Sequence, residues 1–183
     1  MLILIGGGVR SGKSAFGLAL AKRLGSRRVY LATAEAQDEE MAARIQLHSR
    51  ERGSEFRTLE EPREVVAAAG SVEDADVLVI DCLTLWLSNL LLQGDSEEAI
   101  LGQVGRLIET LRGKPFHAVL ITNEVGMGVV PETSLGRAFR DLSGRAHQAL
   151  AALAEEIYFG VLGALIRLKP APLALVMARE VAR

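Results

Sequence analysis

The sequence predicts an α/β fold built around a mostly parallel sheet with helices on both faces. Short apolar runs alternate along the chain with segments of helical periodicity, and this alternation is typical of parallel sheets. A glycine-rich loop directly follows the first apolar run, as in strand–loop–helix units. The last two apolar runs are joined by only two residues, so we expect them to form an antiparallel hairpin at the edge of the sheet.

Six segments are predicted as strands, because each is a short, mainly apolar run. They are residues 2–6, 29–33, 77–81, 118–122, 157–161 and 164–168. Five helices are predicted between them, from apolar periodicity and from terminal signals such as the capping box Asp95-Ser96-Glu97-Glu98. These helices are residues 13–24, 38–52, 83–93, from this capping box to about 112, and 134–156.

The loop after the first strand has the P-loop pattern G-x-x-x-x-G-K-[ST]. Its residues are Gly7, Gly8, Val9, Arg10, Ser11, Gly12, Lys13 and Ser14. Gly7 and Gly12 allow the backbone to turn its N–H groups toward a phosphate, and the following helix adds its positive end. Lys13 is expected to reach the β- and γ-phosphates, and the Ser14 hydroxyl to bind Mg²⁺. The chain is therefore predicted to bind a nucleoside triphosphate, on a P-loop NTPase (RecA-like) fold.

A carboxylate follows another predicted strand, in the run Val77-Leu78-Val79-Ile80-Asp81. P-loop proteins use such an aspartate to organise Mg²⁺, which is the Walker B role. Asp81 is therefore predicted as a metal-binding residue together with Ser14. The alternative is an aspartate that only ends a strand.

Polar residues and glycines also follow the strand at 118–122, in the segment Thr122-Asn123-Glu124-Val125-Gly126-Met127-Gly128. Ligands of open α/β sheets bind at this edge. Glu124 could hold Mg²⁺ through water or orient a hydroxyl group. The alternative is an ordinary glycine-rich turn.

His48 is the candidate nucleophile. Helical spacing puts it on one stripe with Met41 and Ile45, between Arg44 and Arg52. Two guanidinium groups favour the neutral, nucleophilic imidazole and would neutralise phosphate oxygens during attack on phosphorus. The alternative is a surface histidine beside two arginines. His117 and His147 are interpreted as structural, and no cysteine and histidine spacing indicates a zinc site.

The whole chain, residues 1–183, is predicted to form a single catalytic domain. It has 49% hydrophobic and 24% charged residues and a net charge of −2, so it offers no basic surface for nucleic acid. A single cysteine, Cys82, fits a reducing compartment. The apolar N-terminus is interpreted as a strand and not as a signal peptide, and no apolar run is long enough to span a membrane. We therefore expect a cytoplasmic enzyme.

From residue 2 to about residue 169, the chain resembles the bifunctional adenosylcobinamide kinase / adenosylcobinamide-phosphate guanylyltransferase family of cobalamin biosynthesis. The segments that carry the resemblance are residues 6–14, 30–34, 38–52 with Arg44-Ile45-Gln46-Leu47-His48, 57–62, 78–84, 122–131, 139–141 and 144–145. Two departures are visible: residue 147 is His where the family leads us to expect Asn, and a tail follows Lys169.

The resemblance implies two reactions at one site. ATP or GTP phosphorylates a hydroxyl of adenosylcobinamide. GTP then transfers GMP to a histidine, here His48, and from it to adenosylcobinamide phosphate, giving adenosylcobinamide-GDP. The resemblance also implies that the chain is a homo-oligomer, namely a trimer. The apolar segments 83–92 and 170–183 are candidate interfaces, and core segments are the alternative, since composition does not distinguish the two. The nucleotide contacts that the resemblance implies, besides Gly7–Ser14, are Thr33, Ser49, Arg50, Glu51, Arg52, Glu60 and Asp81.

Two other functions share part of this pattern. A simple P-loop kinase or NTPase would use the P-loop and Asp81 but form no covalent nucleotide. A GTP-dependent switch would need an Asn-Lys-x-Asp segment, which the chain lacks.

Overall fold

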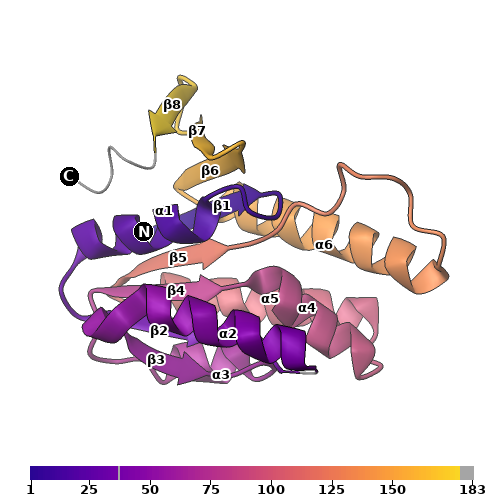
Figure 1. Cartoon of the computed structure of the whole chain (residues 1–183). Coiled ribbons are helices and arrows are strands. Elements are labelled where there is room, and N and C mark those ends of the chain that lie inside the picture. The colour runs from indigo at the N-terminus through magenta and orange to yellow at the C-terminus, as the bar shows by residue number, and fades with distance from the viewer. Residues whose placement is uncertain (37, 178–183) are drawn as a thin grey trace.

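Eight strands form a single sheet in the order β3-β2-β4-β5-β1-β6-β7-β8. The computed structural model describes residues 1–36 and 38–177 (Figure 1). Within that part, some side chains on α2 and β8 are not described. The strands are β1 (Leu2–Gly7), β2 (Arg28–Ala32), β3 (Arg57–Glu60), β4 (Val77–Asp81), β5 (His117–Ile121), β6 (Glu156–Val161), β7 (Ala164–Lys169) and β8 (Ala174–Met177). The helices are α1 (Lys13–Leu24), α2 (Glu39–Arg52), α3 (Val65–Gly70), α4 (Leu83–Leu92), α5 (Glu97–Arg112) and α6 (Ser134–Leu153), with a 3₁₀ turn at Gly53–Glu55.

The first six strands of this order are parallel, as the alternation of strands and helices predicted. The register pairs Ala32 with Asp81, and Asp81 with Ile121. Because the strands run in the same direction, their carboxyl ends meet at one edge of the sheet. This edge is where a ligand site is expected.

The two faces of the sheet are buried under different helices. One apolar cluster contains Phe16 of α1 and strand residues such as Ile3 and Ile5. The other contains the buried faces of α3, α4, α5 and α6 together with strand residues such as Leu2 and Leu4. Successive side chains of β1 therefore enter opposite clusters, as expected of a strand that is covered on both faces.

The predicted C-terminal hairpin is confirmed, because β6 and β7 pair in antiparallel fashion across Leu162-Gly163. Both turn residues have positive φ, 52° and 80°, as tight two-residue hairpins require. The hairpin is not the edge of the sheet, however, because β8 pairs antiparallel with β7. Residues 174–177, part of the tail whose partner the sequence left open, therefore extend the sheet.

Three other features differ from the predictions. The predicted helix 134–156 ends at Leu153, since Glu155 N–H donates to Leu2 O at 2.9 Å and the chain joins the sheet. β3 and α3 were not predicted. The candidate interface helix 83–92 is packed mainly into the core, with Leu83, Trp86 and Leu87 each 1% exposed, whereas Leu92 at its end is 57% exposed. Among the described residues, no helix combines the length and apolarity needed to cross a membrane.

Candidate nucleotide site

The P-loop joins β1 to α1 at the carboxyl edge of the sheet. Gly7 has a φ of 150°, and a Cβ on it would lie 2.5 Å from Gly160 O, so only glycine fits between β1 and β6. Gly12 has a φ of 90° and is the N-cap of α1. Arg10 also has a positive φ, 56°. The loop therefore has the backbone path, followed by a helix N-terminus, that phosphate-binding loops use.

Lys13 lies inside this loop and is only 7% exposed. Its Nζ donates to Gly8 O at 3.1 Å, which folds the side chain back over the loop. Burial lowers the pKa of Lys13, while the nearby Asp81 carboxylate acts to raise it. The loop therefore presents a buried cation beside its backbone N–H groups, and this combination suits a phosphate chain.

Asp81 lies at the end of β4 and is fixed by neighbours from another strand. Tyr30 OH donates to Asp81 Oδ2 at 2.8 Å. The fully buried Thr33 hydroxyl donates to Cys82 O at 2.7 Å and accepts from Cys82 N–H at 2.8 Å. Thr33 N–H donates to Asp81 O at 3.2 Å. Thr33, predicted as a nucleotide contact, thus uses its hydroxyl to hold the chain next to Asp81.

The donors at Ser14 and Asp81 suit Mg²⁺, because a hydroxyl and a carboxylate are hard oxygen ligands. Nucleotide-bound Mg²⁺ takes only one or two protein ligands and completes its shell with phosphate oxygens and water. Within the described part of the chain, no group of three or more His, Cys, Asp or Glu side chains forms a metal cage. The donor set therefore fits a metal that is bound together with a nucleotide.

Two other predicted positions lie on elements near this edge. Glu60 ends β3 and is exposed, and its backbone is in register with Ala32 of β2. The backbone of residues 48–52 lies in α2, which begins after the N-cap Asp38, whose side chain accepts from Met41 N–H at 2.7 Å. Arg50 is exposed, whereas the side chains of His48, Ser49, Glu51 and Arg52 lie outside the described part of the structure. Figure 1 shows α2 in front of the sheet, below α1.

The structure brings to the site residues that the sequence did not place there. Tyr30 and Gly160 come to the site from β2 and β6. His147, interpreted from sequence as structural, lies on α6 with Nε2 2.7 Å from Thr122 Oγ1 and Nδ1 4.0 Å from Glu124 Oε2. These contacts join residues distant in sequence, and no motif spacing encodes them.

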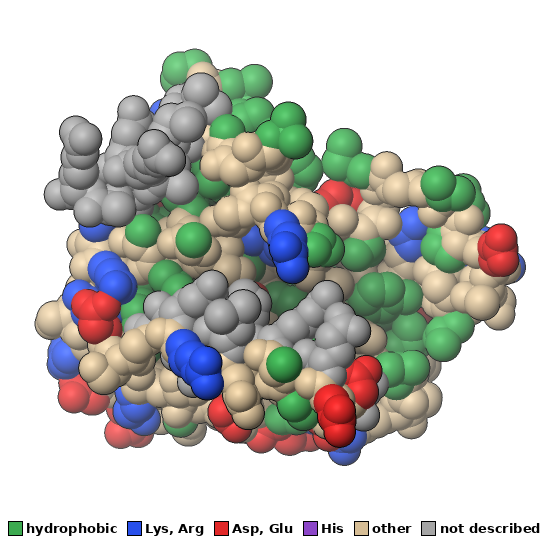
Figure 2. Space-filling view, in the orientation of Figure 1, with side chains coloured by type: hydrophobic (Ala, Val, Ile, Leu, Met, Phe, Trp, Pro, Cys, Tyr) green, Lys and Arg blue, Asp and Glu red, His purple; other side chains and the backbone are tan. Residues whose placement is uncertain are grey.

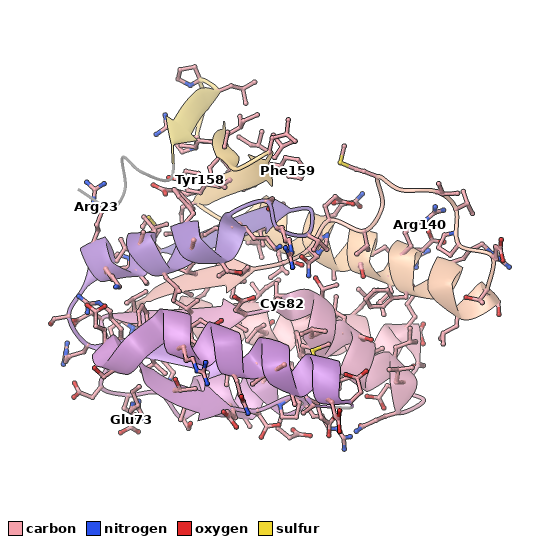
Figure 3. All side chains as sticks on the ribbon, viewed as in Figure 1. Arg23, Glu73, Cys82, Arg140, Tyr158 and Phe159 are labelled. Atoms are coloured by element: carbon pink, nitrogen blue, oxygen red, sulfur yellow. The ribbon has the colours of Figure 1, made fainter. Side chains whose placement is uncertain are left out.

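The free thiol of Cys82 is 5% exposed, and burial raises its pKa to about 12. Figure 3 shows Cys82 at the centre of the molecule.

Comparison with protein families matches residues 3–168 to the family described as cobinamide kinase / cobinamide phosphate guanyltransferase. The bifunctional adenosylcobalamin biosynthesis protein CobP of Pseudomonas aeruginosa is 44% identical over 171 residues, covering 93% of this chain and 98% of that protein. The bifunctional adenosylcobalamin biosynthesis protein CobU of Escherichia coli K12 is 39% identical over 184 residues, covering 92% and 100%.

Comparison with solved structures supports the fold alone, because the identities are low. The RadB recombinase superimposes with a TM-score of 0.53 at 14% identity, over 95% of this chain and 85% of that one. A type III secretion system ATPase from pathogenic bacteria superimposes with a TM-score of 0.50 at 13% identity, over 88% and 51%. The predicted RecA-like P-loop architecture is therefore confirmed.

Proposed function

Because the chain belongs to the cobinamide kinase / cobinamide phosphate guanyltransferase family, we propose that one P-loop site serves both of its reactions and that His48 carries GMP between them. The chain is a bifunctional nucleotide-using enzyme of adenosylcobalamin biosynthesis. The observation that supports a single site is the convergence of the P-loop, Asp81 and Glu124 at one sheet edge, where Glu124 N–H donates to Gly7 O at 3.0 Å.

In the kinase step, the P-loop N–H groups and Lys13 bind the phosphates of ATP or GTP. A hydroxyl of adenosylcobinamide attacks the γ-phosphorus, and the nucleoside diphosphate leaves with the bridging oxygen. Such a transfer depends mainly on positioning and on charge stabilisation, which the buried Lys13 ammonium and the N-terminus of α1 supply. Ser14 and Asp81 would hold Mg²⁺, which supplies charge neutralisation to the phosphate oxygens when bound.

In the transferase step, an imidazole nitrogen of His48 attacks the α-phosphorus of GTP. The bond from the α-phosphorus to the bridging oxygen breaks, and pyrophosphate leaves. A phosphate oxygen of adenosylcobinamide phosphate then attacks the same phosphorus, the P–N bond breaks, and adenosylcobinamide-GDP forms. This assignment of His48, and the nucleotide contacts proposed for Ser49–Arg52, Thr33 and Glu60, rest on the family resemblance.

The test is to incubate the protein with Mg²⁺ and α-labelled GTP, without cobinamide, and then to separate it under denaturing conditions. We expect a label on the wild type that is lost in acid and survives alkali, as a phosphoramidate should, and no label on His48→Ala. GTP binding measured in parallel should be retained in His48→Ala. An equal label on both proteins would rule out His48 as the carrier, and no label on either, with GTP bound, would indicate a simple P-loop kinase.

We further propose that the chain assembles as a homotrimer. Apolar side chains gather on the surface over the β6–β7–β8 end of the sheet and over the loop before α6 (Figure 2). Leu162 is 99% exposed and Leu173 69% exposed in the first area, and Val129 is 95% exposed in the second. Apolar groups exposed together in this way are typical of surfaces that bind a partner.

A further inference from the structure

The loop after β5 carries a carboxylate to which the two reactions, as described above, give no role. Glu124 lies beside the P-loop, through the bond from its N–H to Gly7 O. Its Oε1 accepts from Gly126 N–H at 2.5 Å, and its Oε2 lies 4.0 Å from His147 Nδ1. The side chain is 29% exposed, so the carboxylate is held in place and still open to a substrate.

His147 is oriented from the other side by a chain of hydroxyl groups. Its Nε2 lies 2.7 Å from Thr122 Oγ1, which lies 3.0 Å from Thr84 Oγ1. Thr84 Oγ1 accepts from Asn123 N–H at 2.7 Å, and its own hydrogen can go to Thr122 Oγ1 at 3.0 Å or to Asn123 O at 3.5 Å. The shorter contact favours Thr122, which then donates to His147 Nε2, so that the neutral ring carries its hydrogen on Nδ1 and faces Glu124 with it.

The protonation of His147 agrees with this arrangement. Burial lowers the pKa of His147, and the Glu124 carboxylate opposes that shift. The lowered pKa favours the neutral imidazole, with Nε2 bonded to Thr122 Oγ1 and Nδ1 facing Glu124 Oε2 at 4.0 Å.

A groove of about 210 Å³ is lined in part by these two side chains. It runs between α6 and the β1–β6–β7 part of the sheet, and most of its lining is apolar. Its lining includes Ala151 of α6, Phe159 of β6 and Leu168 of β7. Figure 3 labels Phe159 on β6. The groove has room for a short aliphatic chain whose polar end would reach Glu124 beside the P-loop.

We propose that this groove receives the hydroxyl-bearing arm of the cobinamide, that Glu124 accepts the hydroxyl proton in the kinase step, and that His147 is the positioning residue of Glu124. The hydroxyl oxygen forms its bond to the γ-phosphorus while the bond to the bridging oxygen breaks. The proton passes to Glu124 Oε2, and the nucleoside diphosphate leaves. This inference rests on the kinase function. Of the two roles that the sequence left open for Glu124, binding Mg²⁺ through water or orienting a hydroxyl group, it assigns the one directed at the hydroxyl group.

Glu124→Gln tests the proton acceptor, since the amide oxygen still accepts from Gly126 N–H but takes up no proton. We expect kcat for cobinamide phosphorylation to fall about 100-fold or more, within the range of general-base catalysis. Labelling of the protein by α-labelled GTP without cobinamide should stay at the wild-type rate. If labelling is lost as well, Glu124 serves the nucleotide or its metal, and the proposal is wrong. If the wild type phosphorylates cobinamide and the variant does so equally well, the proposal alone fails, whereas an inactive wild type contradicts the kinase function itself.

His147→Ala and His147→Asn together test the positioning role. We expect His147→Ala to lower kcat of the kinase step about tenfold with little change in KM for ATP. The Asn amide occupies the place of the ring Nδ1 and can donate to Glu124, so His147→Asn should recover most of kcat. A purely structural role predicts equal losses in the two variants and a loss of labelling by GTP, and either result would overturn the role of His147.

The groove is tested by a matched pair on neighbouring residues of α6. Ala151 is half-buried and lines the groove, whereas Ala152 is exposed and does not. Ala151→Leu should fill part of the groove and raise KM for cobinamide about tenfold, with labelling by GTP unchanged. Ala152→Leu should leave both readouts unchanged. Equal KM values for cobinamide in the two variants would place the arm elsewhere.

Discussion

At the scale of single residues, Asp76 fixes the end of the sheet opposite the nucleotide site. Its Oδ2 accepts from Ser26 N–H at 2.9 Å and from Arg27 N–H at 2.8 Å, and its Oδ1 accepts from Arg27 Nε at 2.9 Å. The Arg27 guanidinium, together with these N–H groups, holds the pKa of Asp76 well below its ordinary value of 3.8. The ionised carboxylate therefore stabilises the loop between α1 and β2.

This contact predicts a pH-dependent loss of stability in Asp76→Asn. The pKa of Asp76 is lower in the folded protein than in the unfolded chain. The stabilisation is therefore complete above the pKa of Asp76 in the unfolded chain, and it is lost as the pH falls toward the pKa in the folded protein. We expect Asp76→Asn to lower Tm by a few degrees between pH 5 and 7, and the difference from wild type to shrink below about pH 3.8. Thermal unfolding at pH 7, 5, 4 and 3 measures this difference in Tm, and Glu73→Gln, at an exposed position, is the control. A difference that grows as the pH falls would contradict the assignment.

The site could be predicted from sequence only where a motif is continuous along the chain. Gly7 and Lys13 are such cases, because the P-loop motif directly follows a strand. Asp81 is another, because it directly ends a strand. Tyr30 and His147 come from separate elements and reach the site only through the register of β2 with β4 and through the packing of α6. Tyr30 lies within the segment 30–34 and His147 was noted as a departure from the family, but no local pattern links either side chain to Asp81 or Glu124, so the fold was needed to find these contacts.

At the scale of elements, the placement of α1 depends on Gly17. A Cβ on Gly17 would lie 2.7 Å from Ile121 Cδ1 and 3.5 Å from Ile5 Cδ1, and both isoleucines are fully buried. The missing side chain thus allows α1 to lie close against the sheet. Because α1 begins with Lys13 and Ser14, its distance from the sheet sets the position of both side chains.

Gly17→Ala is therefore expected to lower the free energy of unfolding by about 1–3 kcal/mol through overpacking, and to weaken GTP binding. Gly105→Ala on α5 is the matched control, because a Cβ there meets nothing within 4 Å. It should stabilise the protein by about 0.5–1 kcal/mol, since alanine favours a helix over glycine. Urea unfolding and the Kd for GTP measure both variants. If Gly17→Ala is at least as stable as wild type, α1 can shift away from the sheet without cost and the predicted overpacking is wrong.

The elements that the sequence predicted are those whose apolar pattern agrees with their final environment. β1, β4 and β5 are continuous apolar runs that are buried on both faces, and α1 and α5 match their predicted spans closely. β3 escaped prediction because its sequence Arg57-Thr58-Leu59-Glu60 is mostly exposed at the sheet edge and has no apolar run. The overlong helix 134–156 shows the opposite case, in which helical periodicity continues past Leu153 but pairing with β1 takes over.

At the scale of the whole molecule, the β6–β7 turn contains an exposed leucine, Leu162, whose presence is not explained by the packing of a single chain. Leu162 has a φ of 52°, a conformation that favours glycine, asparagine or aspartate, and its side chain is 99% exposed. Neither backbone preference nor burial within the chain accounts for a leucine at this position. Val161 and Leu168, on the strands that flank the turn, are 42% and 44% exposed. Apolar groups exposed together in this way are typical of a surface that binds a partner, and in the proposed trimer a second copy would cover them.

Leu162→Asn is therefore expected to have opposite effects on the subunit and on its assembly. Asparagine suits the positive φ, so the unfolding free energy of the separated subunit should not fall, while the loss of apolar contact should weaken the proposed trimer. Sedimentation velocity at micromolar concentration should show a mass three times that of the chain for the wild type and a shift toward the single chain for Leu162→Asn. Leu92→Asn, at the exposed end of α4, is the control and should keep the wild-type mass. A trimer that resists Leu162→Asn would place the interface away from this hairpin, and a wild type that sediments as a single chain would exclude the trimer.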